Sequence, residues 1–151
     1  MKRVIPIAFF LALVCQPTMA VAKSDPIVGT WQVATKLVSA SDPTNPAYTP
    51  GQRREETWKF QAQKKNMKLT TWSGWKKRKL IGSILGKKTG KAWVFEETYN
   101  TGWGILIHQY IVARVHTDGR LRGTIETGYH SAQFGYLVGK DALSFYGTKS
   151  R

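Results

Sequence analysis

The amino-acid sequence predicts an all-β protein, with its strands arranged as an antiparallel up-and-down β-barrel of eight or nine strands. Three observations lead to this prediction. Apolar and polar side chains alternate with period two in many segments after residue 22, and helical periodicity is absent there. The connections between these segments are short, with one exception. Antiparallel strands joined in this way hide their edges well by closing into a barrel, and a β-sandwich is the alternative.

The amino end is expected to be a secretory signal peptide that covers residues 1–22. Two basic residues precede an apolar run at 4–14, and Ala20-Val21-Ala22 supplies small residues at the cleavage point. The run is shorter than the roughly 20 residues that span a bilayer, so we expect no integral membrane span. The alternative is a lipoprotein anchored at Cys15. Residues 23–151 then form one secreted or periplasmic domain.

The first strand is expected near residues 28–38, and a long loop follows it at 39–53. This loop contains three prolines and lacks strand alternation. It is typical of an Ω-like loop across one mouth of the barrel. Two interpretations are open, a lid over a cavity and a disordered decoration.

The next hairpin is predicted with its register. Trp58, Phe60 and Ala62 share one face of a strand at 55–63, and Met67, Leu69 and Thr71 share one face of a strand at 67–75. Placing Ala62 opposite Met67 brings the apolar sets together and leaves residues 63–66 as a four-residue turn. Strands near 78–85 and 91–99 follow.

A further hairpin begins at Ile105. A three-residue loop, Thr117-Asp118-Gly119, closed by His116 and Arg120 sets Val115 opposite Leu121 and Ile111 opposite Ile125, with Gly119 left-handed. At the carboxyl end, a two-residue turn at Lys140-Asp141 is predicted. That turn matches Phe134, Tyr136 and Val138 with Leu143, Phe145 and Gly147.

Basic residues outnumber acidic ones by 23 to 9, which gives a formal net charge of +14. One interpretation is a solvated surface that keeps the protein soluble. The other is binding to a polyanion such as lipopolysaccharide, a glycosaminoglycan or nucleic acid, which would weaken steeply with salt. The aromatics interleaved with basic residues at 72–79 could stack on bases or sugars of such a polymer, or the two tryptophans could cover a seam of the barrel beside a solvated turn. The candidate polyanion-binding residues are Trp72, Trp75, Lys76, Lys77, Arg78, Lys79, Lys87 and Lys88.

Gly29-Thr30-Trp31 opens the first predicted strand, and this motif resembles the Gly-x-Trp signature of short bacterial lipocalin-like (calycin) β-barrels. The resemblance implies structural roles for Gly29 and Trp31, with Trp31 closing the bottom of the barrel. It also implies that a basic side chain near the carboxyl end, Lys149 or Arg151, stacks on the tryptophan. A rival resemblance is to avidins, because Leu69–Gly74 is similar to a biotin-lining strand of that family.

The aromatic residues are numerous enough to fill such a barrel or to line its cavity. Glu56 and Glu97 share strand faces with aromatic side chains, and Gln109 is the polar exception on an apolar face. These three are expected inside the cavity or at its rim, where they would meet arginines or lysines. The candidate ligand-binding residues are Trp58, Phe60, Trp93, Phe95, Glu97, Tyr99, Gln109 and Tyr136.

The sequence does not favour catalysis, so we expect no enzyme. The three histidines lack metal-ligand spacing, and the serines lack the context of a nucleophile. We expect neither a metal site nor a cofactor. The leading hypothesis is an exported binding protein for a small, mostly apolar ligand, and the alternative is a basic surface protein whose partner is an anionic envelope polymer. A homo-oligomer is left open.

Overall fold

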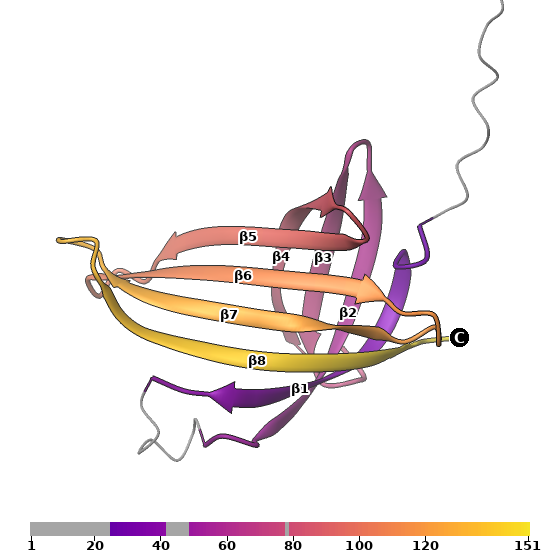
Figure 1. Cartoon of the computed structure of the whole chain (residues 1–151), viewed down its shortest axis with the longest axis horizontal. Helices are drawn as coiled ribbons and strands as arrows, with labels where there is room; N and C mark the ends of the chain where they lie inside the picture. Colours follow the sequence, from indigo (N-terminus) through magenta and orange to yellow (C-terminus); the bar gives the residue numbers. More distant parts are fainter. Residues whose placement is uncertain (1–24, 42–48, 78) are drawn as a thin grey trace, which may run out of the picture.

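The structure is a computed structural model that describes residues 25–41, 49–77 and 79–151 (Figure 1). The predicted signal peptide, Cys15 and Arg78 therefore lie outside the described residues, as do residues 42–48 of the predicted loop.

Eight antiparallel strands form a closed barrel in which each strand pairs with the next and the last pairs with the first (Figure 1). All regular elements of the described residues are strands, so the predicted all-β up-and-down barrel is confirmed, with eight strands rather than nine. The strands are β1 (Gly29–Ser39), β2 (Arg53–Gln63), β3 (Asn66–Ser73), β4 (Lys79–Thr89), β5 (Ala92–Asn100), β6 (Ile105–Val115), β7 (Leu121–Ser131) and β8 (Leu137–Lys149).

The predicted registers of two hairpins are confirmed. Ala62 lies opposite Met67 in the β2–β3 pair, and Gln63 pairs with Asn66, so the connecting loop is two residues shorter than expected. In the β6–β7 pair, Val115 lies opposite Leu121 and Ile111 opposite Ile125. Matching of apolar faces fixes both registers, because a one-residue slip would turn each strand's apolar side chains to the solvent.

The loop between β6 and β7 also has the predicted form. The backbone N–H of His116 donates to the carbonyl of Arg120 at 2.9 Å, which closes the loop. Gly119 has a φ of 74°, a left-handed conformation that favours glycine.

The predicted carboxyl-terminal hairpin is wrong. β8 runs through Lys140-Asp141 without a turn, and the chain reverses instead at residues 132–136. The observed register pairs β7 with β8 from Leu121 opposite Gly147 to His130 opposite Leu137. This long ladder satisfies more backbone groups than the short predicted hairpin and still sets Ile125 opposite Leu143.

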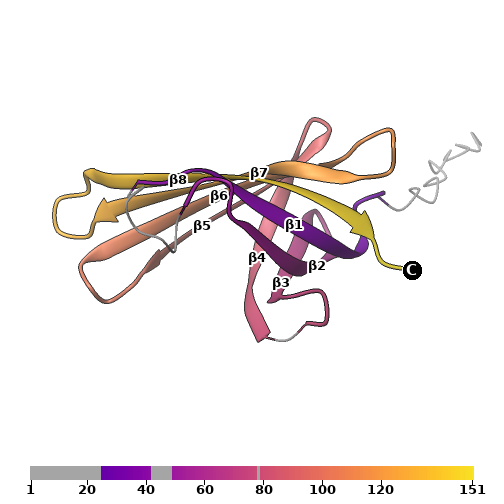
Figure 2. The same ribbon diagram turned by 90° about the horizontal axis from the view of Figure 1, so that it is seen from below.

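β4 and β5 pair over only part of their length. Their ladder runs from Thr89 opposite Ala92 to Gly86 opposite Phe95 and ends there. From that point the amino-terminal half of β4 diverges from the carboxyl-terminal half of β5 (Figure 2). The barrel is therefore fully laddered at one end and parted between these two strands toward the other.

Large apolar side chains fill the fully laddered half of the barrel. Trp58 contacts Phe145 at a centroid distance of 4.6 Å, and Phe60 contacts Phe95 at 5.8 Å. Such aromatic pairs contribute about 0.5–1.5 kcal/mol each beyond their buried area. The buried core also contains Ile27, Trp31, Val33, Met67, Leu69, Trp93, Ile111, Ala113, Leu121 and Ile125.

Trp31 closes this end of the barrel, as the Gly-x-Trp resemblance implies. The ammonium of Lys149 lies 5.5 Å from the centroid of the Trp31 ring and donates a hydrogen bond to the carbonyl of Pro26 at 3.1 Å. The Trp31 indole N–H donates to the carbonyl of Ile27 at 2.8 Å. Gly29 leaves room for the lysine, since a Cβ at this position would lie 2.7 Å from Lys149 Cε. Lys149, rather than Arg151, is the basic residue on the tryptophan.

Candidate functional site

A cavity of about 380 Å³ occupies the half of the barrel opposite Trp31. Every strand contributes to its lining, from the end that lies away from the packed core. Its wall residues are Thr35, Leu37, Gln52, Arg54, Glu56, Trp58, Thr71, Ile81, Tyr99, Ile107, Gln109, Ile111, Ile125, Thr127, Tyr129, Asp141 and Leu143. The barrel is thus packed in one half and hollow in the other.

The inner wall of the cavity is apolar. Trp58 belongs to the packed core and also faces the hollow, so it forms the boundary between the two halves. Ile111 and Ile125 lie opposite each other on β6 and β7, and they also belong to both the core and the cavity wall. Burial of a ligand against these groups would be favoured by about 25 cal/mol per Å² of apolar surface removed from water.

Glu56 is the first polar group of the wall. Its side chain lies on the inward face of β2, two residues before Trp58. The indole N–H of Trp58 donates a hydrogen bond to Glu56 Oε2 at 2.6 Å. Burial raises the pKa of the Glu56 carboxyl above its usual value, and the hydrogen bond and the nearby Arg54 oppose that shift only in part. The cavity therefore contains a partly desolvated carboxyl group whose ionised form a further hydrogen-bond donor or a cation would stabilise.

Asp141 is the second polar group, and it is buried. Asp141 Oδ2 accepts a hydrogen bond from the Tyr129 hydroxyl at 2.7 Å, and Oδ1 accepts from the backbone N–H and the hydroxyl of Ser41 at 2.8 and 3.1 Å. These bonds satisfy a buried carboxylate with neutral donors. They also join β7, β8 and the segment after β1 at the cavity wall.

The rim of the cavity is open between the parted strands. Ile81 of β4 and Tyr99 of β5 are both exposed and both line the cavity, one on each side of the gap in the ladder. Burial, together with the negative charge of Glu97, raises the pKa of the Tyr99 hydroxyl, which keeps it a hydrogen-bond donor. A ligand can therefore meet a tyrosine hydroxyl at the entrance.

The structure brings some of the predicted ligand-binding residues together and disperses others. Trp58, Tyr99 and Gln109 line the cavity. Phe60 and Phe95 are fully buried in the core below it. Glu97 is partly buried opposite Gln109 and does not belong to the wall.

Two predicted ligand-binding residues lie far from the cavity. Trp93 is buried at the closed end, where its indole N–H donates to Asp25 at 3.1 Å beside a second hollow of about 290 Å³. Tyr136 is exposed in the turn between β7 and β8, because the predicted carboxyl-terminal hairpin does not form.

Sequence reasoning missed Asp141, Tyr129, Thr127 and Arg54. Asp141 was assigned to a turn, so its inward position could not be seen. A signal was present, because Asp141 has the same strand parity as Leu143 and Phe145, which both point inward.

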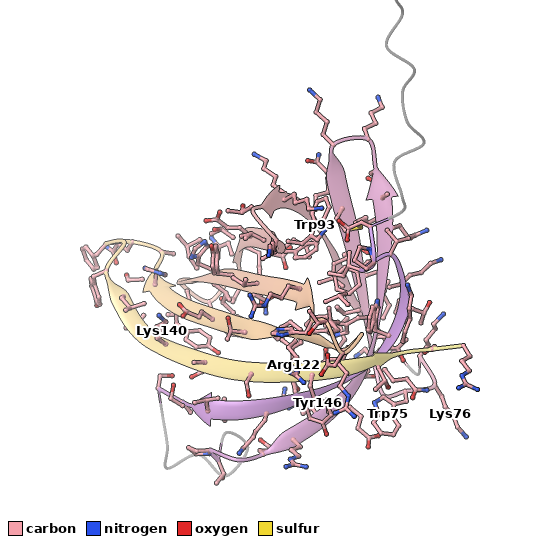
Figure 3. All side chains as sticks on the ribbon, turned by 45° about the vertical axis from the view of Figure 1, so that its right-hand side comes forward. Trp75, Lys76, Trp93, Arg122, Lys140 and Tyr146 are labelled. Carbon is pink, nitrogen blue, oxygen red and sulfur yellow. The ribbon has the colours of Figure 1, made fainter. Side chains whose placement is uncertain are left out.

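The predicted polyanion-binding residues lie in two separate groups. Trp75 and Lys76 lie side by side in the turn between β3 and β4 (Figure 3), and Lys77 follows them. The ammonium of Lys77 lies 5.1 Å from the ring centroid of Trp72. Lys79 begins β4, whereas Lys87 and Lys88 lie near its other end. Lys87 lies eight positions after Lys79 along the strand, which corresponds to about 26 Å. The seven candidates among the described residues therefore do not form one surface.

Lys88 interacts with an acidic and an aromatic side chain of the protein itself. Its ammonium lies 2.7 Å from Asp25 and 5.7 Å from the ring centroid of Trp93. Burial disfavours ionisation of Asp25, but hydrogen bonds from Lys88, Ile27 and Trp93 outweigh it and lower the pKa of that carboxyl.

Among the described residues, no group of three or more histidine, cysteine, aspartate or glutamate side chains could hold a metal ion. His108 lies 2.9 Å from Glu96, as an exposed pair on the outer face of β5 and β6. In the same part of the chain, no helix has the length and apolar character to cross a membrane.

Comparisons with known proteins support the fold. No protein-family model matches the chain, and no curated protein matches it. Among solved structures, the chain is similar to the monomer form of the M. tuberculosis PknI sensor domain, with a TM-score of 0.53 and 16% identity over 82% of this chain and 86% of that one. It also resembles EF1p2_mFAP2b bound to DFHBI, with a TM-score of 0.43 and 16% identity over 82% of this chain and 94% of that one. At 16% identity, the likeness to the sensor domain concerns the fold alone.

Proposed function

We propose that this protein is a binding protein rather than an enzyme, and that its cavity takes a small amphiphilic ligand. The observation that supports this proposal is the half-hollow barrel, with an apolar inner wall and a few convergent polar groups. A cavity of about 380 Å³ falls within the roughly 300–1,000 Å³ of small-molecule sites. The apolar body of the ligand would lie against Trp58, Ile111 and Ile125.

The polar end of the ligand is proposed to be a hydrogen-bond donor, such as a hydroxyl or an amine. Two carboxyl groups, Glu56 and Asp141, face the cavity, and an ionised carboxylate only accepts hydrogen bonds. A carboxylate ligand would meet two carboxyl groups in a partly desolvated site, which is costly, and Arg54, which also lines the cavity, would offset only part of that repulsion. The +14 formal charge of the chain therefore does not make the cavity an anion site.

We also propose that the protein is a lipocalin-like barrel and that it is exported. The contact of Lys149 with Trp31 and the close approach at Gly29 support a lipocalin-like (calycin) barrel. Residues 1–22 support export, with cleavage before Lys23. Amino-terminal sequencing of the protein recovered from the producing cell tests export, and a chain that begins at Met1 contradicts it.

A matched ligand series tests the binding proposal. Titration calorimetry with decanol, decylamine and decanoate compares three head groups on one apolar chain. We expect decanol and decylamine to bind with one site per chain, and decanoate to bind about tenfold more weakly or not at all. The variant Glu56→Gln should reduce the preference for decylamine, whereas Glu55→Gln, on the outer face of the same strand, should not. Failure of all three ligands to bind contradicts the proposal.

A second candidate function is polyanion binding by the turn between β3 and β4. Trp75 is 46% exposed there and is followed by Lys76 and Lys77, which are also exposed. A stacking side chain beside two ammonium groups is suited to an anionic polymer. Elution from heparin should shift to lower salt in the variant Trp75→Ala/Lys76→Ala/Lys77→Ala, while Lys64→Ala/Lys65→Ala, at another hairpin tip, serves as the charge-matched control. Equal shifts contradict a dedicated site.

A further inference from the structure

The two most exposed large apolar residues of the described chain, Trp103 and Phe134, lie at one end of the barrel together with three other exposed apolar residues, and we call these five residues the aromatic tip. They are Trp103 in the turn between β5 and β6, and Phe134, Tyr136, Leu137 and Val138 in the turn between β7 and β8 and at the start of β8. Trp103 is 89% exposed, Phe134 68% and Tyr136 58%. Exposure of such large apolar side chains to water costs free energy, and the fold leaves these side chains exposed.

The two turns form one ordered unit. The backbone N–H of Ala132 donates to the carbonyl of Gly104 at 2.8 Å and so ties the second turn to the first. The N–H of Ser131 donates to the carbonyl of Tyr136 at 2.9 Å, and the rings of Phe134 and Tyr136 stack with centroids 6.1 Å apart. Both turns lie at the same end of the barrel, where they project beyond the sheet (Figure 1).

Charge is absent from the chain segments that build this tip. Residues 98–113 and 127–139 contain no lysine, arginine, aspartate or glutamate, although the chain has 23 basic and 9 acidic residues. The first charged residue of β8 is Lys140, whose ammonium lies 2.6 Å from Glu126. The aromatic tip, which includes a tryptophan and a tyrosine, is therefore an uncharged projection of a strongly basic protein.

We propose that the aromatic tip docks on a lipid bilayer, with Trp103, Phe134 and Tyr136 in the interfacial layer of an anionic membrane. Tryptophan and tyrosine prefer that layer because each has an apolar ring and a polar group. The two turns project beyond the sheet (Figure 1), so their side chains can enter a fluid interface without a complementary groove. Without residues 1–22 the chain has 21 basic and 9 acidic residues, and this net charge of +12 favours anionic head groups as the partner. The geometry therefore selects a bilayer rather than a second copy of this equally basic chain.

Docking in this way would place the cavity close to the lipid. Ile107 and Tyr129 line the cavity and lie opposite each other on β6 and β7, and the next inward pair along this ladder, Ile105 and Ser131, ends both strands at the tip. The inference goes beyond the proposed function, since it concerns the outer surface and stands even if the cavity binds no ligand.

Tryptophan quenching tests the docking on the full chain. Vesicles of equimolar phosphatidylcholine and phosphatidylglycerol, with acyl chains brominated near the glycerol, quench only those indoles that enter the interface. Residues 1–22 contain no tryptophan, so the signal comes from the barrel. We expect quenching that Trp103→Phe largely abolishes and that Trp75→Phe, another exposed tryptophan, leaves intact.

Affinity provides a second measurement. The variant Phe134→Ser/Tyr136→Ser should lower the vesicle partition coefficient by about tenfold or more, because two large apolar side chains no longer leave water. The control Leu80→Ser/Leu85→Ser removes two exposed apolar residues of β4 and should change it little. Quenching that Trp103→Phe does not reduce overturns the proposal. A tip variant that binds vesicles as tightly as the wild type also overturns the proposal. The same holds for a tip variant whose only effect, measured by sedimentation, is to convert an oligomer to a monomer.

Discussion

The hydroxyl of Tyr129 on β7 donates a hydrogen bond to Asp141 on β8 at 2.7 Å. This bond lies in the cavity wall, between two strands whose pairing at this point the sequence pattern did not predict. The same carboxylate accepts two hydrogen bonds from Ser41, a residue a hundred positions earlier in the chain. Asp141 thus fixes three segments of the cavity wall at once.

Removing this carboxylate should destabilise the barrel. The variant Asp141→Ala removes the carboxylate that accepts hydrogen bonds from the Tyr129 hydroxyl and from the N–H and hydroxyl of Ser41, which we expect to cost about 2–3 kcal/mol of unfolding free energy. Urea unfolding measures the loss. Glu126→Ala removes an exposed carboxylate from β7 whose partner is Lys140, and it should cost only about 0–1 kcal/mol. Equal losses in the two variants contradict a structural role for Asp141.

Glu56 should make stability depend on pH in a defined direction. Because burial raises its pKa above the usual 4.5, the ionised carboxyl destabilises the folded state; that penalty is fully present above the folded pKa and disappears as the pH falls below 4.5. Glu56→Gln cannot ionise and still accepts from Trp58. We therefore expect the variant to be more stable than the wild type at neutral pH, with a difference that shrinks on acidification.

Urea unfolding at a series of pH values measures that difference. Glu55→Gln, which changes an exposed residue on the outer face of β2, should stay within about 0.5 kcal/mol of the wild type throughout. A Glu56→Gln difference that is constant with pH would show that the carboxyl is not desolvated in the fold.

The closed end makes a separate prediction. Lys149→Ala loses the cation–π contact with Trp31 and the hydrogen bond to Pro26, which together should cost about 1–2 kcal/mol. Arg151→Ala removes a nearby basic residue that is exposed at the end of the chain, and we expect little change. Thermal unfolding compares the two variants, and a Tm loss no greater for Lys149 than for Arg151 argues against the stacking.

Much of the fold could be predicted from the sequence because local patterns fixed it. The alternation around Trp58 and Phe60 set the β2–β3 register, and the need to pair Val115 with Leu121 selected the loop that ends at Gly119. Trp31 and Lys149, far apart in the chain, were connected only through the Gly-x-Trp resemblance, which implied a geometry that alternation alone could not give.

The cavity could be predicted only in part. Trp58, Tyr99 and Gln109 line the cavity, but strand parity does not tell how far along the barrel the packed core ends. Phe60 and Phe95 therefore lie below the hollow instead of around it. Asp141 was missed because a polar pair, Lys140-Asp141, is a common turn signal, and its burial depends on Tyr129 and Ser41 donors that only the tertiary structure supplies.

The central claim is that the cavity itself binds the ligand, and a cavity-filling variant tests it most directly. Thr127 points into the hollow from β7, whereas Thr124 is exposed on the outer face of the same strand. Calorimetric titration with decanol should give binding with one site per chain for the wild type and for Thr124→Phe, and a loss of about tenfold or more in affinity for Thr127→Phe. Unchanged decanol binding by Thr127→Phe, or no binding by the wild type, contradicts the account.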